Sequence, residues 1–334
     1  MRRLLVIGLV ALVQWGCTET KTDECVTAPE QASEKIPIPF EQFQDSLLTI
    51  QSKSQLVALF TRQPLIRDYI FRRTEYPDDS VFINEIFERL TNPHLDTLGT
   101  EVQRVFGDLS SLKTEFTEAF TNLKAYYPDF RIPKIQTVIS GLDTDMLLTD
   151  SLIIVSLDFY LGRGAKYRPQ MYEYLLRKYD PDDIVPSALL IYGIDERFNH
   201  TDLKDKTVLA DMIAYGKSFY FAKHMLPCVA DSVFIWYTPE EMKGVRENKN
   251  LIWARFIESE VLFATSQMVK KDYLSERPVT IQVGEKCPGR IGQWVGWEIV
   301  KSYMDSHPDL SLPQLMTLGD AQTFFKESRF NPKK

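Results

Sequence analysis

The sequence is poor in the residues and motifs on which many enzyme sites depend. Its 334 residues include only four histidines and four cysteines. No two histidines lie within one helical turn of each other, and the zinc-protease motif His-Glu-x-x-His is absent. The phosphate-binding pattern Gly-x-x-x-x-Gly-Lys-Ser/Thr and the nucleophile pattern Gly-x-Ser-x-Gly are absent as well. The sequence therefore gives no support to the enzyme classes that carry these motifs.

The sequence also lacks an excess of basic residues and a long apolar run. Lys and Arg number 39, whereas Asp and Glu number 46, which gives a net charge of −7. Nucleic-acid binding normally needs a basic surface, so we expect no nucleic-acid partner. No apolar run reaches the roughly 18–20 residues of a membrane span. With 44% hydrophobic and 25% charged residues, the chain has the composition of an ordinary folded protein.

The first residues have the pattern of an export signal. Two arginines precede ten residues that carry no charged or polar side chain. The small Gly16 before Cys17 suggests lipoprotein processing, in which residues 1–16 are removed and Cys17 is acylated. Gln14 and Trp15 depart from the usual processing motif, so a plain secretory signal is the alternative. We expect an exported protein that is lipid-anchored to the cell-envelope membrane and faces the periplasm.

The predicted mature chain begins with a polar segment. Residues 17–35 are rich in Thr and Glu, which predicts a flexible tether that carries the lipid, and residues 36–334 are predicted to form a single globular domain. Cys25 lies in the tether, whereas Cys228 and Cys287 lie in the body. An export compartment permits disulfides, but spacing does not determine which cysteines pair. We do not expect a Cys228–Cys287 bridge, because nothing local demands it.

The hydrophobic pattern predicts helices around a small sheet. Residues 40–127 carry apolar side chains at three- and four-residue spacing, as amphipathic helices do. Residues 135–140 and 152–159 are short and β-branched, and the Gly- and Asp-rich stretch 141–150 separates them, which predicts a two-stranded unit. Further helices are predicted over residues 169–179, 182–192, 207–225, 251–270 and 289–306, and from Pro239 onward. The expected fold class is α+β, helix-dominated, with a small β-sheet near the middle of the chain.

One segment near the C-terminus combines glycines, tryptophans and an arginine. Gly292 and Gly296 are four residues apart, so on a helix they share a face where another backbone can approach closely. Trp294 and Trp297 are three residues apart and are also neighbours on a helix. One interpretation is a tightly packed core helix. The other is a contact surface on which Arg290 binds an anion or a partner.

Four stretches of the chain form long, aromatic motifs: residues 288–304, 250–258, 212–217, and 157–162 followed by Tyr167. In these stretches the chain resembles the gliding-motility lipoprotein GldB family of the Bacteroidota. The export signal, the chain length and the closing residues 330–332 fit the family as well. The resemblance implies a role in gliding motility and in the associated type IX protein-secretion machinery. It also implies other lipoproteins, GldD- and GldJ-like, as partners.

A fainter similarity points to predicted zinc-dependent peptidases. Laid on this chain, the His-Glu-x-x-His motif of such enzymes falls on residues 215–219, and their third ligand falls on Glu258. Tyr215 and Phe219 then take the places of the two histidines, and Gly216 takes the place of the general base. Aromatic rings offer zinc no lone pair apart from a phenol oxygen, and no group remains to deprotonate a bound water. The arrangement would be a degenerate zincin, and in the alternative alignment this helix was never catalytic. Both predict no metal, no cofactor and no catalytic residue by this route.

Three hypotheses follow for function. The first is a non-catalytic, lipid-anchored envelope protein that acts through protein–protein contacts. The second is a metallopeptidase-like hydrolase with an unrecognised site that uses Glu258 and His224. The third is an envelope protein that binds a small anionic or glycan ligand at Arg290 and the two neighbouring tryptophans. We adopt the first, because the anchor, the tether, the missing catalytic groups and the resemblance all favour it.

Overall fold

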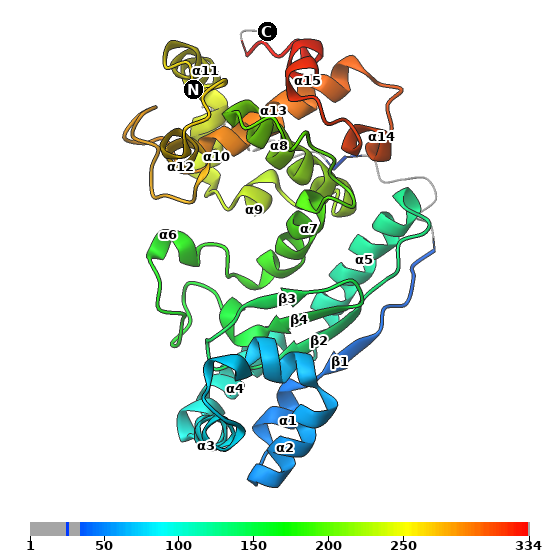
Figure 1. Cartoon of the computed structure of the whole chain (residues 1–334), viewed down its shortest axis with the longest axis vertical. Helices are drawn as coiled ribbons and strands as arrows, with labels where there is room; N and C mark the ends of the chain where they lie inside the picture. The colour runs from blue at the N-terminus through cyan, green and yellow to red at the C-terminus, as the bar shows by residue number, and fades with distance from the viewer. Residues whose placement is uncertain (1–24, 27–33, 333–334) are drawn as a thin grey trace, which may run out of the picture.

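The computed structural model describes residues 25–26 and 34–332 of the chain. The predicted signal peptide, residues 1–16, and the predicted lipidation site Cys17 lie outside the described residues. The body is elongated, with helices α1–α4 at one end, helices α8–α15 at the other, and a sheet and helix α7 between them (Figure 1). Helices dominate and the only sheet among the described residues is small, so the predicted α+β class is confirmed.

The sheet has four strands in the order β1-β2-β4-β3. The strands are β1 (Phe40–Gln42), β2 (Lys134–Val138), β3 (Met146–Leu148) and β4 (Leu152–Ser156). β1 and β4 both pair with β2 in parallel, whereas β3 pairs with β4 antiparallel. The β-branched runs predicted the central strands β2 and β4 correctly. β3 lies inside the stretch that was predicted to be only a connection. The sequence did not reveal this strand, because three residues are too few to show the two-residue period of a strand.

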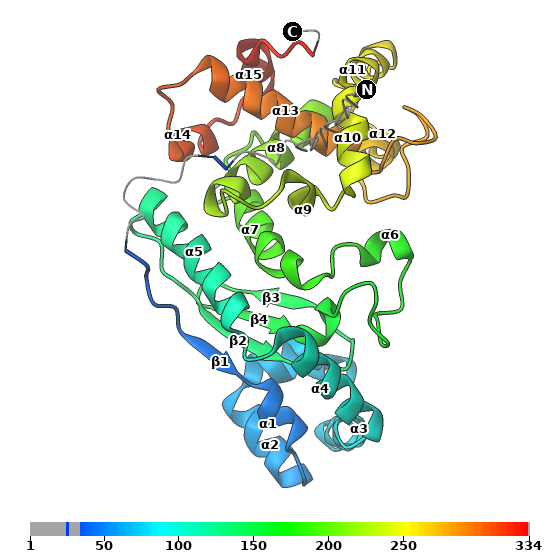
Figure 2. The same cartoon turned by 180° about the vertical axis from the view of Figure 1, so that it is seen from behind.

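The N-terminal helices pack around one end of this sheet. They are α1 (Gln44–Leu48), α2 (Lys53–Arg62), α3 (Asp79–Leu90), α4 (Pro93–Phe106) and α5 (Ser110–Tyr126). Ser52, Asp78 and Asn92 accept hydrogen bonds from the first turns of α2, α3 and α4 and so start these helices. Helix α5 runs alongside the sheet (Figure 2). The prediction that helix begins at Phe40 is wrong, because residues 40–42 pair with a strand almost a hundred residues away.

The second half of the chain is helical. Its helices are α6 (Glu173–Leu176), α7 (Ile184–Ile194), α8 (Val208–Met225), α9 (Asp231–Ile235), α10 (Pro239–Glu247), α11 (Lys249–Glu258), α12 (Gln267–Leu274), α13 (Ile291–Ser306), α14 (Leu312–Met316) and α15 (Ala321–Ser328). Thr207 caps α8, and Thr238 forms a capping box with Glu241 at α10, so both predicted helix starts are confirmed. Within the described residues, no helix is long and apolar enough to cross a bilayer.

Two predicted helices differ from the structure. The helix predicted over residues 169–179 is reduced to the four residues of α6. The helix predicted over 251–270 is two helices, α11 and α12, because the chain leaves helical conformation after Glu258 and Glu260 adopts a left-handed backbone (φ 50°). Left-handed conformation at a non-glycine residue interrupts a right-handed helix, and the apolar spacing alone did not reveal it.

Candidate functional site

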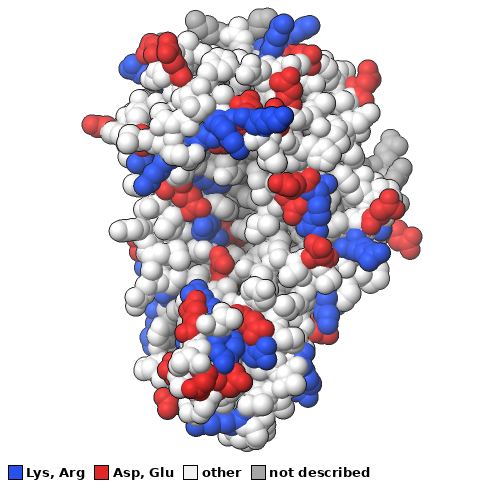
Figure 3. Space-filling model, in the orientation of Figure 1, with Lys and Arg blue, Asp and Glu red and all other residues white. Residues whose placement is uncertain are grey.

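A cleft of about 300 Å³ lies where α7, α8 and the start of α13 meet. Its lining residues are Asp145, Met146, Tyr160, Lys178, Tyr179, Ser187, Leu190, Ile191, Ile194, Tyr215, Ser218, Phe219, Trp236, Glu276, Arg290 and Gln293. Ile191, Ile194 and Tyr215 are large apolar side chains that remain partly exposed there. Figure 3 shows that this face of the molecule is hollowed near its middle and carries charges of both signs around the hollow. Three of the sequence-predicted residues, Tyr215, Phe219 and Arg290, line this cleft.

Arg290 lies at the inner wall of this cleft. It is only 8% exposed, and it occupies the N-cap position of α13 with a left-handed backbone (φ 63°). Its guanidinium donates to the Ile235 carbonyl oxygen at 3.0 Å and to Gln293 Oε1 at 2.9 and 3.1 Å. The same group stacks over the Trp236 ring, 4.0 Å from the ring centroid. Burial lowers the pKa of Arg290 to about 10, so the guanidinium is charged at neutral pH.

The positive charge of Arg290 has no direct ion pair among the described residues. Glu276, whose charge raises the pKa of Arg290 from a distance, forms its ion pair with Lys178 at 3.1 Å. Asp145, the other acid of the cleft, accepts a hydrogen bond from the Tyr179 hydroxyl at 2.9 Å. A buried guanidinium without a carboxylate partner is a natural contact for a carboxylate or another anion.

The structure does not bring the predicted remnant zinc ligands together. Tyr215 and Phe219 both line the cleft, but the Phe219 ring is almost fully buried and stacks on Trp297 with ring centroids 5.1 Å apart. Glu258 lies at the exposed end of α11 and pairs there with Arg255 at 2.9 Å. Gly216 faces α13, because a methyl group at this position would overlap the Gly296 backbone. Among the described residues, no group of three or more His, Cys, Asp or Glu side chains is placed to hold a metal.

The tryptophans of α13 are core residues. Trp294 is 2% exposed and Trp297 is 1% exposed, and neither lines the cleft. The packed-helix interpretation is therefore correct for both tryptophans, and the contact-surface interpretation is wrong for them because buried rings cannot touch a partner. Of the residues in this helix that were predicted to bind, only Arg290 reaches a concave surface.

The His224 ring packs against neighbouring aromatic side chains. Its Nδ1 lies 2.7 Å from the Tyr220 carbonyl oxygen, and its ring contacts those of Tyr220 and Tyr126. Burial lowers the pKa of the His224 ring, which favours its neutral form. His224 sits at the end of α8, and Glu258 is ion-paired at the end of α11, so no described contact joins the pair on which the hydrolase hypothesis depends.

Two residues of the motif stretches have structural roles that sequence reasoning missed. Lys217 is 1% exposed, and its ammonium donates to the carbonyl oxygens of His200 (2.7 Å), Leu318 (2.8 Å) and Met316 (3.3 Å). It thereby joins α8 to the C-terminal segment, and burial lowers its pKa to about 7. Asp158 is fully buried and accepts the Ser140 and Leu142 N–H groups, which orders the turn after β2. These partners are distant in sequence, so no local sequence pattern predicts the contacts.

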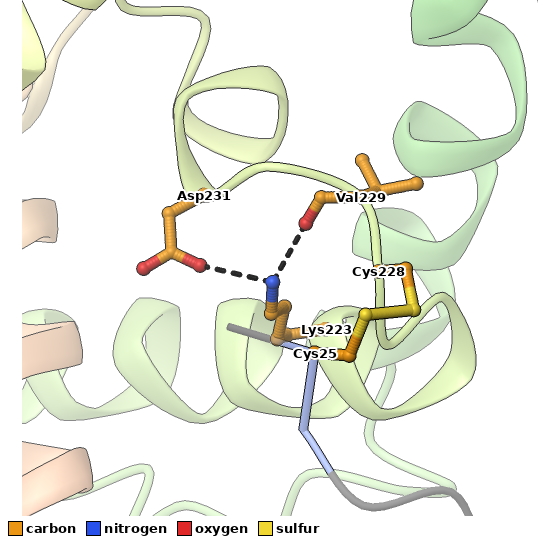
Figure 4. Close-up of a disulfide and its surroundings, with 5 residues drawn as sticks. All are labelled: Cys25, Lys223, Cys228, Val229 and Asp231. Carbon is orange, nitrogen blue, oxygen red and sulfur yellow. Dashed lines mark hydrogen bonds and ion pairs between the residues drawn. A yellow bond between two sulfur atoms is a disulfide. The ribbon is translucent and has the colours of Figure 1, made fainter. Parts of the chain in front are cut away.

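A disulfide joins Cys25 to Cys228, across a sequence separation of 203 residues (Figure 4). The Val26 N–H donates to the Pro227 carbonyl oxygen at 3.2 Å beside it. Cys287 is a free thiol, so the expectation of no Cys228–Cys287 bridge is confirmed. Cys25 lies inside the tether predicted over residues 17–35, and the bridge bonds it to the body at this point. A polar segment shows no local sign of such a partner.

Comparison with known proteins gives one match. A family model described as gliding motility protein GldB matches residues 24–332, which includes all of the described body. No curated protein and no solved structure matches the chain. The fainter similarity to zinc-dependent peptidases finds no support in these comparisons.

Proposed function

Because the chain belongs to the gliding motility protein GldB family, we propose that it is a non-catalytic, lipid-anchored component of the envelope machinery for gliding and type IX protein secretion. It acts through contacts with other lipoproteins of the GldD and GldJ kinds. The family match over residues 24–332 is the observation that carries this proposal.

The disulfide supports the export part of the proposal. Cys25 and Cys228 are both exposed, yet they are paired. Exposed disulfides persist in oxidising compartments such as the periplasm and are reduced in the cytosol. The bridge therefore fits a protein that is secreted across the inner membrane, as the signal pattern and Cys17 predict.

The site geometry supports a non-catalytic role. A zinc peptidase needs two histidines one helical turn apart and a general base between them. Here Phe219 and Gly216 are used for packing against α13, and Glu258 is ion-paired at the surface. Phe219 and Gly216 make the α8–α13 contact, and Glu258 lies apart from them on α11.

The test is a clean gene deletion in the native host, with colony spreading and the secreted-protein profile as readouts. The deletion strain is complemented with wild type, Cys17→Ala or Glu258→Ala, and the amount of each protein is measured. We expect deletion to abolish spreading or secretion, Glu258→Ala to restore it, and Cys17→Ala to fail. Normal spreading and secretion after deletion would refute the proposed role. Failure of Glu258→Ala at normal protein level would favour the hydrolase hypothesis.

A second candidate function is ligand binding in the cleft, which the unpaired charge of Arg290 favours. Trp236 stacks on Arg290, so an anion that reaches the guanidinium should change the fluorescence of this tryptophan. The test titrates the protein with a panel of carboxylated peptides and anionic glycans. A saturable change that disappears in Trp236→Phe supports binding in the cleft. Unchanged fluorescence across the panel counts against it.

A further inference from the structure

The disulfide restricts how far the body can move from its proposed lipid anchor. Only seven residues, 18–24, separate Cys17 from Cys25. An extended chain spans about 3.5 Å per residue, so the body surface at Cys228 can lie at most about 28 Å from the lipidated residue. Without the bridge and the single Val26–Pro227 hydrogen bond beside it, the next described residue with a hydrogen bond to the body is Ile36, whose N–H donates to Thr121 Oγ1. That segment is 19 residues long and spans up to about 65 Å.

The attachment point is joined to the body by buried polar contacts. Lys223, in the last turn of α8, is 4% exposed, and its ammonium donates to the Val229 carbonyl oxygen at 2.7 Å and pairs with Asp231 at 3.4 Å (Figure 4). These contacts close the loop that carries Cys228 over the end of α8. On the other side, the buried Asn122 amide of α5 donates to the Met225 carbonyl oxygen at 2.8 Å. The loop therefore transmits the position of the bridge to both α8 and α5.

We propose that the Cys25–Cys228 disulfide is a short mooring that keeps the Cys228 loop within about 28 Å of the lipidated residue and so turns this side of the body, rather than helices α1–α4, toward the membrane. The inference rests on the proposed lipidation of Cys17. In both views of the chain, α1–α4 lie at the end of the long axis away from α8 (Figures 1 and 2). The mooring places the Cys228 side of the body nearer the lipid bilayer, and it presents the α1–α4 end to partners in the periplasm.

The mooring can be released chemically, because both sulfurs belong to exposed residues. Dithiothreitol supplies two electrons and two protons, the S–S bond breaks, and two thiols and the cyclic disulfide of the reductant form. Release leaves the lipid and the covalent chain intact. It lengthens the longest reach of the tether from about 28 Å to about 65 Å.

The test uses the full lipidated protein in vesicles that contain an acceptor dye in the lipid headgroups. A clickable p-azidophenylalanine replaces either Tyr69, which is 56% exposed at the α1–α4 end, or Asp305, which is exposed at the end of α13. The charge of Asp305 acts on Tyr220, within the last turns of α8, so this position reports on the Cys228 side. Energy transfer to the lipid dye is measured for both positions, before and after dithiothreitol.

We expect transfer from position 305 to exceed transfer from position 69 by at least about twofold in the disulfide form, since the moored side is within the short reach. The ratio should fall toward one after reduction and in the double variant Cys25→Ser/Cys228→Ser. Cys287→Ser is the matched control, because it removes a thiol without touching the bridge, and its ratio should equal that of wild type. If the double variant does not fold, reduction of vesicle-bound wild type gives the same comparison.

Two outcomes overturn the mooring, and mass spectrometry distinguishes them. An acylated chain whose ratio is the same with and without the bridge refutes the mooring alone. A chain that carries no acyl group at Cys17 refutes the proposed anchor and the mooring with it. The gliding role would then be judged by the deletion experiment only.

Discussion

Gly216 of α8 and Gly296 of α13 lie backbone against backbone at the crossing of these two helices. A methyl group on Gly216 would overlap the carbonyl of Gly296, and one on Gly296 would overlap the carbonyl of Met212. Only glycine allows two helices to approach so closely, and the rings of Phe219 and Trp297 stack beside the contact. The four-residue spacing of Gly292 and Gly296 predicted a close backbone approach, and the structure confirms it.

The first prediction concerns this crossing. Gly296→Ala should lower the free energy of unfolding by at least about 1–3 kcal/mol, because an added methyl group forces two packed backbones apart. Thermal or urea denaturation measures the change. Gly244→Ala is the matched control, since Gly244 lies within α10 and nothing is within 4 Å of the added carbon. It should stabilise the protein by up to about 1 kcal/mol, as alanine does in an open helix. Equal effects of the two changes would contradict this account of the crossing.

The second prediction concerns Lys217. Replacing it with methionine removes the donor for three carbonyl oxygens, those of His200, Met316 and Leu318. A buried acceptor that loses its partner costs about 1–3 kcal/mol when the surrounding structure does not relax. We therefore expect the free energy of unfolding to fall by roughly 2–4 kcal/mol in total. Urea denaturation measures it. Lys243→Met is the control, because Lys243 is exposed and should change stability by no more than about 0.5 kcal/mol. A loss at Lys217 no larger than at Lys243 would show that the carbonyls do not need the lysine.

The third prediction is a dependence of stability on pH. Burial and the charges of Asp182, Glu118 and Asp183 raise the pKa of Glu115 to about 8, from an ordinary value of 4.5. The folded state therefore binds a proton that the unfolded state has released between these two pH values. It follows that the contribution of Glu115 to stability decreases as pH rises from about 4.5 to about 8 and is constant above that.

The measurement is the melting temperature of wild type and Glu115→Gln at pH 5, 6.5 and 8. Glutamine cannot ionise, so the stability of the variant should rise relative to that of wild type as pH increases. The difference in the free energy of unfolding should reach on the order of 1 kcal/mol or more at pH 8. Glu88→Gln, a change at an exposed position on α3, serves as the control and should show no such trend. A pH profile of Glu115→Gln parallel to that of wild type would contradict the raised pKa. Asp183, whose pKa burial raises to about 7, should leave part of the slope in the variant.

The fourth prediction concerns the contribution of the disulfide to stability. The bridge closes a loop of about two hundred residues, and such a cross-link restricts the unfolded chain. Cys228→Ser should therefore lower the free energy of unfolding by about 2–5 kcal/mol. Denaturation with and without dithiothreitol measures this, and only wild type and Cys287→Ser should respond to the reductant. A Cys228→Ser protein as stable as wild type would show that the bridge contributes to position rather than to stability.

The sequence alone predicted what depends on neighbouring residues. Thr207, Thr238 and Pro239 mark helix starts because a cap needs only the next few residues. The β-branched runs of β2 and β4 are visible for the same reason. The spacing of Gly292 and Gly296 predicted a close helix contact, although it did not identify Gly216 as the partner. The long motif stretches also identified the family, which the family match confirms.

Only the tertiary structure decided what depends on partners far away in the chain. Residues 40–42 are a strand because they pair with β2. Cys25 is bonded to the body because the fold places Cys228 beside it. Arg290 reaches the cleft beside the end of α9 at Ile235, whereas neighbouring helices bury Trp294 and Trp297 in the core. Local spacing specifies which residues share a helix face. Which of those faces is covered depends on the rest of the fold.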